Sequence, residues 1–420
     1  MKKTNLLLKI QNIIHDTALA HTPDGSKVQA VIDQWIHALA TGSGFFCNPE
    51  IASPELTRQE VIDRLIKENL YENREDFFTK VFGALKLKPN ETPSFTFIDL
   101  FAGIGGVRLG FQQAGGACVF SSEFDKHAQA TYEKNHGEYP FGDITMINPS
   151  HIPDHDVLLA GFPCQPFSHA GLKGGISDTR GTLFYNIAQI LETKRPKFAL
   201  LENVRGLISH DKGYTLKVIL NTLTNMGYSC NIPKEIIRNG TTREVQELAK
   251  KMVLKSIDFG IPQNRQRIYI VLWQDGLIDK FEYPSPLNIK TRVGDILEEN
   301  PAPELTISDR LWEGHQRRKL QNKINGKGFG YGMVHADSPY TNTISARYYK
   351  DGSEVLVYQE NDNPRKLSPR EAARLQGFPE EFEPSNSNVQ AYKQFGNSVT
   401  VNVIREIALK IKEYHAHNKP

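Results

Sequence analysis

The spacing of apolar residues changes near residue 95. Before it, apolar side chains recur at helical intervals, as on one face of 28–39: Val28, Val31, Ile32, Trp35, Ile36 and Leu39. Thr57 with Glu60 predicts a capping box ahead of a second apolar face over 61–70. The Pro-containing stretch 88–93 then breaks the pattern and is typical of a linker. We therefore predict a helical N-terminal extension over residues 1–94.

From Phe95 onward, short continuous apolar runs alternate with amphipathic segments of helix length. The runs predict strands at 95–101, 117–121, 157–161, 198–202 and 268–273, and the longer segments predict helices such as 181–194 and 214–227. Strands that are apolar on both faces and separated by helices are typical of a parallel sheet covered on both sides. The fold class predicted for this part is α/β.

The alternation stops after Trp273. Residues 275–360 are rich in Gly, Pro and Asn, and they carry a basic cluster: Arg310, Arg317, Arg318, Lys319, Lys323 and Lys327. Taken alone, such a cluster is ordinarily a solvated helix face. Helical texture returns over 367–415, so we predict a smaller domain at 275–360, inserted between the first part (95–274) and the closing part (361–420) of the larger domain.

Composition excludes several classes of protein. Of 420 residues, 39% are hydrophobic and 23% charged, which describes a soluble globular protein with room for more than one core. A net charge of +2 argues neither for nor against a nucleic-acid partner, so any basic surface must be local. The four cysteines lack the spacing of a zinc site or a disulfide framework, and Lys9 interrupts the only signal-like stretch. We expect a reducing, cytoplasmic location, no metal and no membrane association.

The strongest candidate for chemistry is Cys164. It lies between two prolines in Gly-Phe-Pro-Cys-Gln-Pro-Phe-Ser (161–168), directly after the predicted strand 157–161. A strand that ends in a stiff turn holds the next side chain at the carboxyl edge of the sheet, where α/β enzymes build their sites. Glu202 closes the next strand, and an acid beside a thiol supplies a nucleophile with a proton donor.

A second group of residues suggests a nucleotide-like ligand. The turn Phe101–Gly106 follows a strand and precedes a helix, and its glycines allow close backbone approach, although a purely structural turn explains it equally well. Its spacing is not GxGxxG, which argues against an NAD enzyme. Glu123 ends the next strand, about twenty residues on, where an acid can bond ribose hydroxyls. Asp143 can offer a carboxylate to an adenine amino group.

Arg265 and Arg267 occupy alternate positions of an extended segment, so both side chains can project into the same cleft. They are equally well explained as ion-pair residues.

The order of these segments carries more information than any one of them. The blocks are Phe-Ala-Gly-Ile-Gly-Gly, Gly-Phe-Pro-Cys-Gln-Pro-Phe-Ser, Glu-Asn-Val, Gln-x-Arg-x-Arg, Leu-Gln-Gly-Phe-Pro (375–379) and Gln-Phe-Gly-Asn-Ser-Val (394–399). Over residues 95–415 the series closely resembles the bacterial DNA cytosine-5 methyltransferase family. Residues 328–334 and 345–352 are similar to Dcm-like members. The resemblance implies a Rossmann-like S-adenosylmethionine-dependent methyltransferase sheet with an inserted DNA-recognition domain.

The resemblance also implies residue roles. Cys164 would attack C6 of a target cytosine, and Glu202, protonated through a raised pKa, would bond N3 and the exocyclic amine. Arg265 would support the base and the carboxylate, with Arg267 on the same wall. The residues implied in binding S-adenosylmethionine are Phe101, Gly103, Gly105, Glu123 (ribose), Phe124 (adenine stacking), Asp143 (adenine amine), Pro163, Asn397 and Val399.

The implied partner is double-stranded DNA. The target base must leave the duplex, and the glycine-containing segment 167–180 would close over it. The domain at 275–360 would then read the major groove, and we expect its target to be a GC-rich palindrome containing CC and GG. We expect a monomer associated with the nucleoid, which either works alone or accompanies a cognate restriction endonuclease.

Two alternatives stay open. A tRNA cytosine methyltransferase of related fold is disfavoured by the extended basic domain and its Dcm-like segments. A catalytically silent DNA-binding homologue would have lost Cys164 or Glu202, and both are present. Two segments depart from the family pattern, namely a basic insertion at 233–255 and the N-terminal extension. For the extension a packing role comes first, before DNA contact, assistance to folding or partner binding.

Overall fold

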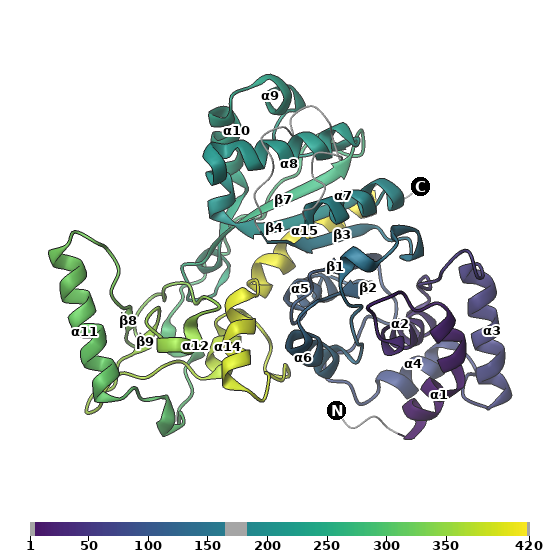
Figure 1. The fold of residues 1–420 in the computed structure, drawn as a ribbon, viewed down its shortest axis with the longest axis horizontal. Helices are drawn as coiled ribbons and strands as arrows, with labels where there is room; N and C mark the ends of the chain where they lie inside the picture. Colours follow the sequence, from purple (N-terminus) through teal and green to yellow (C-terminus); the bar gives the residue numbers. More distant parts are fainter. Residues whose placement is uncertain (1–4, 164–182, 418–420) are drawn as a thin grey trace. The chain divides into compact units, whose positions relative to one another are not determined.

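The computed structural model describes residues 5–163 and 183–417. These residues form two compact units (Figure 1). The first unit comprises Met1–Val253, Arg267–Pro284 and Arg405–Pro420, and the second comprises Leu254–Gln266 and Ser285–Ile404. In the described part of the chain, no helix is both long and apolar enough to cross a membrane.

A mostly parallel sheet organises the first unit. Its strands β1 (Phe95–Leu100), β2 (Gly116–Ser122), β3 (Val157–Gly161) and β4 (Phe198–Val204) are parallel to one another, and β7 (Gln266–Gln274) is antiparallel to β4. The strand order is β2-β1-β3-β4-β7-β5, where β5 is Tyr228–Ser229, and β6 (Val253–Lys255) pairs with β7 off this path. The five predicted strands are present, and the predicted α/β class is confirmed.

The strands are almost fully buried because helices cover both faces. Alternate residues point to opposite faces, so Ile98 and Leu158 join the apolar cluster that includes α7 (Leu183–Lys194) and α8 (Tyr214–Asn225). On the other face, Phe97 contacts Phe111 of α5 (Gly106–Gln113). After residue 95 this unit also contains the helices α6 (Lys126–His136), α9 (Lys234–Asn239), α10 (Thr242–Ala249) and the end of α15 (Val401–His417).

The N-terminal extension is helical, as predicted, and packs beside β2 (Figure 1, purple). Its helices are α1 (Asn5–Ala20), α2 (Val28–Thr41), α3 (Pro54–Lys67) and α4 (Arg74–Phe82). The predicted capping box is wrong: α3 begins at Pro54, and Ser53 caps it by accepting a hydrogen bond from the Leu56 amide. Thr57 therefore lies inside the helix, where its hydroxyl donates to the Ser53 carbonyl at 3.0 Å. A Ser-Pro pair four residues upstream is the stronger start signal.

The second unit has little regular structure. It contains the long polar helix α11 (Asp309–Ile324), the short helices α12 (Tyr348–Asp351), α13 (Pro369–Arg374) and α14 (Asn388–Asn397), and the paired strands β8 (Met333–Val334) and β9 (Leu356–Val357). Its core is built from side chains of these elements and the loops between them, among them Ile344, Tyr348, Leu356, Leu375 and Phe395. The domain boundaries drawn from the sequence stay predictions.

Candidate active site at the carboxyl edge of the sheet

The turn that follows β1 lies where the strand order changes direction. Strand β1 pairs with β2 on one side and β3 on the other, and ligands of open α/β sheets bind in the crevice outside such a switch point. Phe101, Gly103 and Gly105 all have left-handed backbone, with φ of 57°, 57° and 85°. Helix α5 begins directly after this turn, at Gly106.

The two glycines of the turn have different surroundings. A Cβ atom on Gly105 would lie 2.2 Å from Nε2 of His136, whose ring is fully buried, so packing requires glycine there. A Cβ atom on Gly103 would meet nothing within 4 Å, so that side of the turn faces open space. The turn is therefore packed against His136 at Gly105 and open to a ligand at Gly103.

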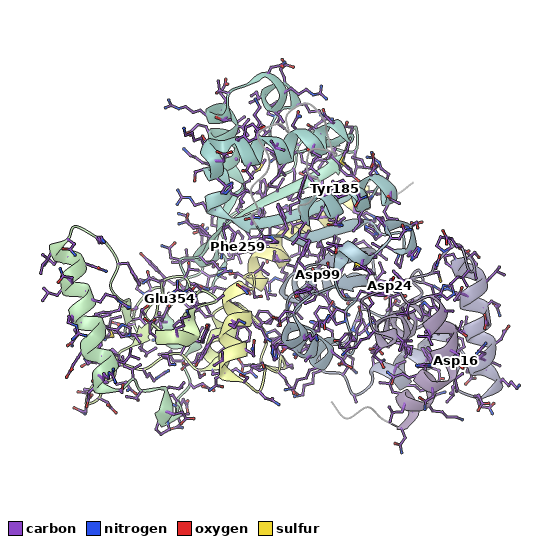
Figure 2. The ribbon with its side chains drawn as sticks, viewed as in Figure 1. Asp16, Asp24, Asp99, Tyr185, Phe259 and Glu354 are labelled. Atoms are coloured by element: carbon purple, nitrogen blue, oxygen red, sulfur yellow. The ribbon has the colours of Figure 1, made fainter. Side chains whose placement is uncertain are left out.

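Asp99 lies within β1, behind the turn, and is labelled in Figure 2. Its side chain is buried, and burial raises the pKa of the carboxyl group to about 7, against the effect of the nearby Arg108 guanidinium. No sequence feature marks this residue, since an acid inside an apolar run gives no local sign of its surroundings.

Glu123 follows β2 and reaches back to the turn. Its Oε2 accepts a hydrogen bond from the Gly103 amide at 2.7 Å, and its Oε1 accepts one from the Asp125 amide at 2.7 Å. Burial raises the pKa of this carboxyl group, while the two amides oppose the shift. The carboxylate is thus fixed beside the open side of Gly103, where its remaining lone pairs can accept from the hydroxyls of a sugar.

Two further predicted residues lie beside Glu123. The ring of Phe124 is 77% exposed, which is unusual for an aromatic side chain directly after a buried strand. The Glu123 amide donates to the Phe141 carbonyl at 2.9 Å, so the segment that carries Asp143 runs along the end of β2. Asp143 caps a short 3₁₀ turn through the Thr145 amide at 2.9 Å. A carboxylate fixed beside an open turn, an exposed aromatic ring and a second carboxylate fit an adenosine-bearing cofactor.

A second set of residues lies at the ends of β3 and β4. Gly161 is paired with Glu202 across the two strands, and a Cβ on Gly161 would lie 3.4 Å from Oε2 of Glu202. Oε1 of Glu202 forms an ion pair with Nε of Arg267 at 3.2 Å, and both side chains are mostly buried. Pro163 is exposed at the same edge. Cys164 and the segment 167–180 lie outside the described residues.

Asn203 is a residue that the sequence analysis gave no role of its own. Its Nδ2 donates to the Phe162 carbonyl at 2.7 Å, and its Oδ1 accepts from the Val204 amide at 2.8 Å. It therefore ties the strand that carries Glu202 to the chain just before Cys164. In the sequence, only the adjacent Glu-Asn pair pointed to Asn203. Its hydrogen-bond partner, Phe162, is 41 residues away in the chain, so the sequence does not reveal the contact.

The second unit contains Arg265, Asn397 and Val399. The guanidinium of Arg265 is buried and donates to the carbonyls of Ile344 and Gly396, each at 3.3 Å, and to that of Ser398. It thus braces the Gly396–Ser398 segment, in which Asn397 is exposed, while Val399 is buried next to it. Arg267 is the arginine that pairs with Glu202, so the two alternate arginines make different contacts. Support of the base by Arg265 stays a prediction.

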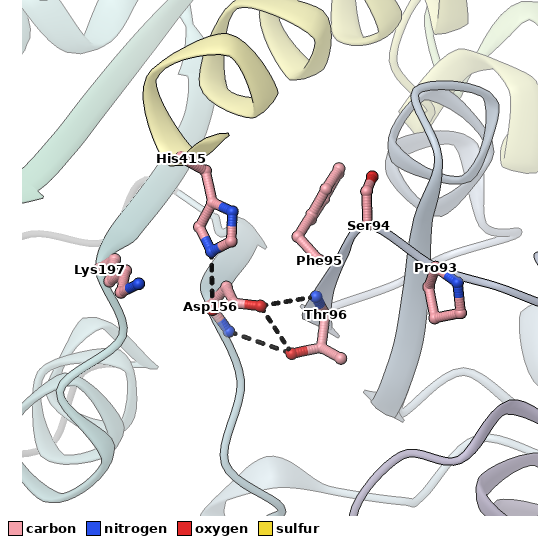
Figure 3. Close-up of a pocket in the computed structure, with 7 residues that line it drawn as sticks. All are labelled: Pro93, Ser94, Phe95, Thr96, Asp156, Lys197 and His415. Atoms are coloured by element: carbon pink, nitrogen blue, oxygen red, sulfur yellow. Dashed lines mark hydrogen bonds and ion pairs between the residues drawn. The ribbon is translucent and has the colours of Figure 1, made fainter. Parts of the chain in front are cut away.

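A hollow of about 460 Å³ lies at the opposite, amino-terminal edge of the sheet (Figure 3). Asp156 dominates it: Oδ2 accepts from the Thr96 amide at 2.9 Å, and Oδ1 pairs with Nε2 of His415 at 2.9 Å. These polar groups bond one another and attach the end of α15 to the sheet. We therefore interpret the polar residues that line the hollow as structural. Across the described residues, no group of three or more His, Cys, Asp or Glu is placed to hold a metal ion.

Comparison with known proteins decides the family. The family model for C-5 cytosine-specific DNA methylase matches residues 95–413. The chain belongs to this family. Type II methyltransferase M.SsoII of Shigella sonnei is 54% identical over 326 residues, covering 77% of this chain and 81% of that protein. Type II methyltransferase M.NlaX of Neisseria lactamica is 57% identical over 321 residues, covering 76% of this chain and 96% of that protein.

The resemblance and the enzyme class drawn from the sequence are thereby confirmed: the chain is a DNA cytosine-5 methyltransferase. Among solved structures, the S. pombe Dnmt2 methyltransferase superposes with a TM-score of 0.56 at 21% identity, covering 74% of this chain and 96% of that one. At that identity the likeness concerns the fold alone. The matches leave the N-terminal extension outside the family model, which begins at residue 95.

Proposed function

We propose that this methyltransferase transfers the methyl group of S-adenosylmethionine to C5 of a cytosine flipped out of a specific duplex sequence. The observation that carries the proposal is the Glu202–Arg267 pair at 3.2 Å. Glu202 is paired across the strands with Gly161, and Gly161 precedes Cys164 by three residues in the sequence. The pair gives the carboxyl edge a fixed acid next to the chain that leads to the thiol.

Cys164 is the nucleophile in this proposal. Its thiolate adds to C6 of cytosine, and the electron pair of the C5–C6 double bond becomes available at C5. S-adenosylmethionine would supply an electrophilic methyl group, and its S–CH3 bond would break so that the sulfonium leaves as the neutral thioether S-adenosylhomocysteine. After C5 has taken that methyl group, a base removes the C5 proton, the C6–S bond breaks, and the thiolate is regenerated.

The other cysteines support this assignment. Burial raises the pKa of both Cys47 and Cys230 to about 11, and it raises the pKa of the buried Cys118 further. Because the thiolate is the reactive form, buried thiols of this kind are inert.

Glu202 bonds N3 and the exocyclic amine of the flipped base. Arg267 orients its carboxyl group through an ion pair that favours the ionised form, so Glu202 must take up a proton before it can donate to N3. A fixed donor at the base neutralises the charge that develops as sulfur adds to C6. Arg265 keeps the supporting role that the family resemblance implies, and within the second unit it braces the segment that carries Asn397.

For the cofactor, the residues present fit the group. Glu123 accepts from the ribose hydroxyls, Phe124 stacks on the adenine, and Asp143 accepts from its amino group, with the open side of Gly103 leaving room for the ligand. Phe101, Gly105, Pro163, Asn397 and Val399 complete this proposed set.

The second unit supplies sequence recognition, with α11 as its basic element. We assign it a GC-rich palindrome containing CC and GG. The relatives M.SsoII and M.NlaX are named Type II methyltransferases, which supports a cognate restriction endonuclease as partner.

A methylation assay with labelled cofactor on duplex DNA and on tRNA tests the reaction, and bisulfite sequencing of the product identifies the target cytosine. We expect label in duplex DNA alone. Cys164→Ala is expected to abolish transfer while DNA binding stays measurable, and Cys230→Ala, a buried thiol distant in sequence, serves as the control. Activity retained in Cys164→Ala would contradict the mechanism, and label in tRNA would change the substrate.

A further inference from the structure

The segment Glu138–Asp143 carries one of the proposed cofactor residues, and the N-terminal extension touches it at several points. On one side the segment follows β2, since the Phe141 amide donates to the Ser121 carbonyl at 2.9 Å and the Phe141 carbonyl accepts from the Glu123 amide at 2.9 Å. The other side faces residues that precede the family match at residue 95. The extension therefore forms one wall of this segment.

The first contacts involve helix α2. Asp33 accepts the Tyr139 amide through Oδ2 at 3.0 Å, and its Oδ1 accepts from Gln11 at 3.1 Å and from Gln29. The side chain of Asp33 is 3% exposed, so this carboxylate is a buried acceptor supplied by the extension to the backbone of the segment. One turn further along α2, His37 lies 3.4 Å from Oε2 of Glu138.

The next contacts come from the loop before α2 and the loop after it. Ser26 accepts the Gly142 amide at 3.3 Å, and a Cβ on Gly142 would lie 2.6 Å from the Gly25 carbonyl oxygen. Two backbones thus meet directly beside Asp143. From the loop after α2, the Phe46 ring packs on Phe141 with centroids 4.4 Å apart.

Two further hydrogen bonds connect this segment to Glu123. The Tyr139 hydroxyl donates to Oε1 of Gln129 at 2.5 Å, and Nε2 of Gln129 donates to the Glu123 carbonyl at 2.6 Å. Both carboxylates proposed for the adenosine moiety are therefore attached to a segment whose outer contacts are made by the extension.

We propose that the N-terminal extension positions the cofactor-binding segment, with Asp33 and Ser26 as positioning residues for Asp143 and Glu123. The inference rests on the cofactor site proposed above. A helical extension that only packed against the sheet would stabilise the fold without changing cofactor affinity. An extension that holds the binding segment in place also affects the affinity for the cofactor, because Asp143 and Glu123 must be in position before the ligand binds.

The test compares Asp33→Ala, Ser26→Ala and Gly142→Ala with a matched control, Thr57→Val, in the full-length enzyme. Asp33→Ala leaves the Tyr139 amide without its buried acceptor, and Gly142→Ala forces the segment away from Gly25 without altering the extension or Asp143. Thr57 is a buried extension residue whose hydroxyl bonds the Ser53 carbonyl within its own helix. Titration calorimetry with S-adenosylmethionine gives the Kd, and thermal melting gives the Tm.

We expect Asp33→Ala and Gly142→Ala to weaken cofactor binding about tenfold, and Ser26→Ala less, with the KM for the cofactor raised and kcat and the Kd for DNA nearly unchanged. Thr57→Val should lower the Tm without changing the cofactor Kd. Folded Asp33→Ala and Gly142→Ala proteins with unchanged cofactor Kd would overturn the inference, as would an equal loss of DNA affinity.

Asp143→Ala separates this inference from the proposed function. If Asp143→Ala weakens cofactor binding and Asp33→Ala and Gly142→Ala do not, the cofactor site stands and the positioning role falls. If Asp143→Ala leaves cofactor binding unchanged, the assigned site is wrong and the inference falls with it.

Discussion

Two glycines of the turn after β1 permit a direct comparison at the residue scale. Gly105→Ala places a Cβ 2.2 Å from the buried ring of His136 at φ 85°. The left-handed backbone costs about 1–2 kcal/mol and overpacking a further 1–3 kcal/mol, so we expect a clear loss of unfolding free energy. Gly103→Ala, at φ 57° with nothing within 4 Å, should cost only the backbone contribution while obstructing the cofactor.

Denaturant unfolding and cofactor titration of both variants check this expectation. We expect Gly105→Ala to lose more unfolding free energy than Gly103→Ala. We expect Gly103→Ala to lose more cofactor affinity than its small loss of unfolding free energy would explain. Equal effects of the two substitutions on both measurements would show that the open side of Gly103 does not face the ligand.

Glu202→Gln keeps the shape of the side chain but removes its charge and its ability to donate a carboxyl proton to the base. Since donors aimed at developing charge are worth about 10²–10³ in kcat, we expect a fall of that order. Cofactor affinity and Tm should change little, because Glu202 lies on β4 and pairs with Arg267 on β7, away from the proposed cofactor residues. Single-turnover kinetics on methylatable duplex DNA give the rate, and a rate within twofold of the parent would remove Glu202 from the mechanism.

At the scale of single elements, the end of α15 is held by the Asp156–His415 pair. The pKa of Asp156 is lowered to about 2, because bonds from His415 and Thr96 outweigh the effect of burial. A carboxyl group with a depressed folded-state pKa stabilises the protein above its unfolded pKa, near 4, and loses that contribution as the pH falls toward 2. The shift corresponds to roughly 2 kcal/mol for this partly buried group.

Asp156→Asn removes this contribution. The difference in unfolding free energy between parent and variant should be greatest above pH 5 and shrink as the pH falls from 4 to 3. Urea unfolding across pH 3–7 measures it. A difference that does not vary with pH would mean that the charge of Asp156 contributes nothing to stability.

The insertion at 233–255 is predicted to support the loop that follows Glu202. Nε2 of Gln246 on α10 donates to the Ile208 carbonyl at 2.9 Å, and its side chain fills the space beside Gly213. Gln246→Ala should speed amide exchange over 205–213 and cost about 1 kcal/mol. The neighbouring Glu247, paired with Lys250 on the surface, provides the control, since exposed pairs contribute little. Unchanged exchange over 205–213 in Gln246→Ala would leave the insertion without this role.

The elements that the sequence predicted well are those whose signal is local. Continuous apolar runs such as 157–161 define buried strands whatever lies around them. The start of α3 was missed because Thr57 and Glu60 match a capping pattern that Ser53 and Pro54 override. Contacts such as Asp33 with Tyr139 join residues far apart in the chain, and a single sequence carries no signal for such pairings.

For the whole molecule, the net charge bears on how the proposed DNA substrate would be bound. A net charge of +2 gives little overall attraction to a polyanion, so phosphate contacts must come from local basic residues. On α11 two adjacent arginines are both exposed but differ in their contacts: Arg318 donates to the Gly330 carbonyl at 3.0 Å and pairs with Asp351 at 3.1 Å, whereas Arg317 makes no such bond among the described residues. Arg318 is therefore committed to the fold of the second unit, and Arg317 is available to a phosphate.

Arg317→Gln is accordingly expected to weaken DNA binding at all sequences and to reduce the slope of log K against log salt by about 0.9, the value for one phosphate contact. Arg318→Gln should lower the Tm, because it removes a bond to the Gly330 carbonyl and the pair with Asp351. Fluorescence anisotropy between 50 and 200 mM salt measures the slope for both variants. If Arg317→Gln leaves the slope unchanged, α11 does not contact the DNA backbone through this residue, and recognition by the second unit must use another face.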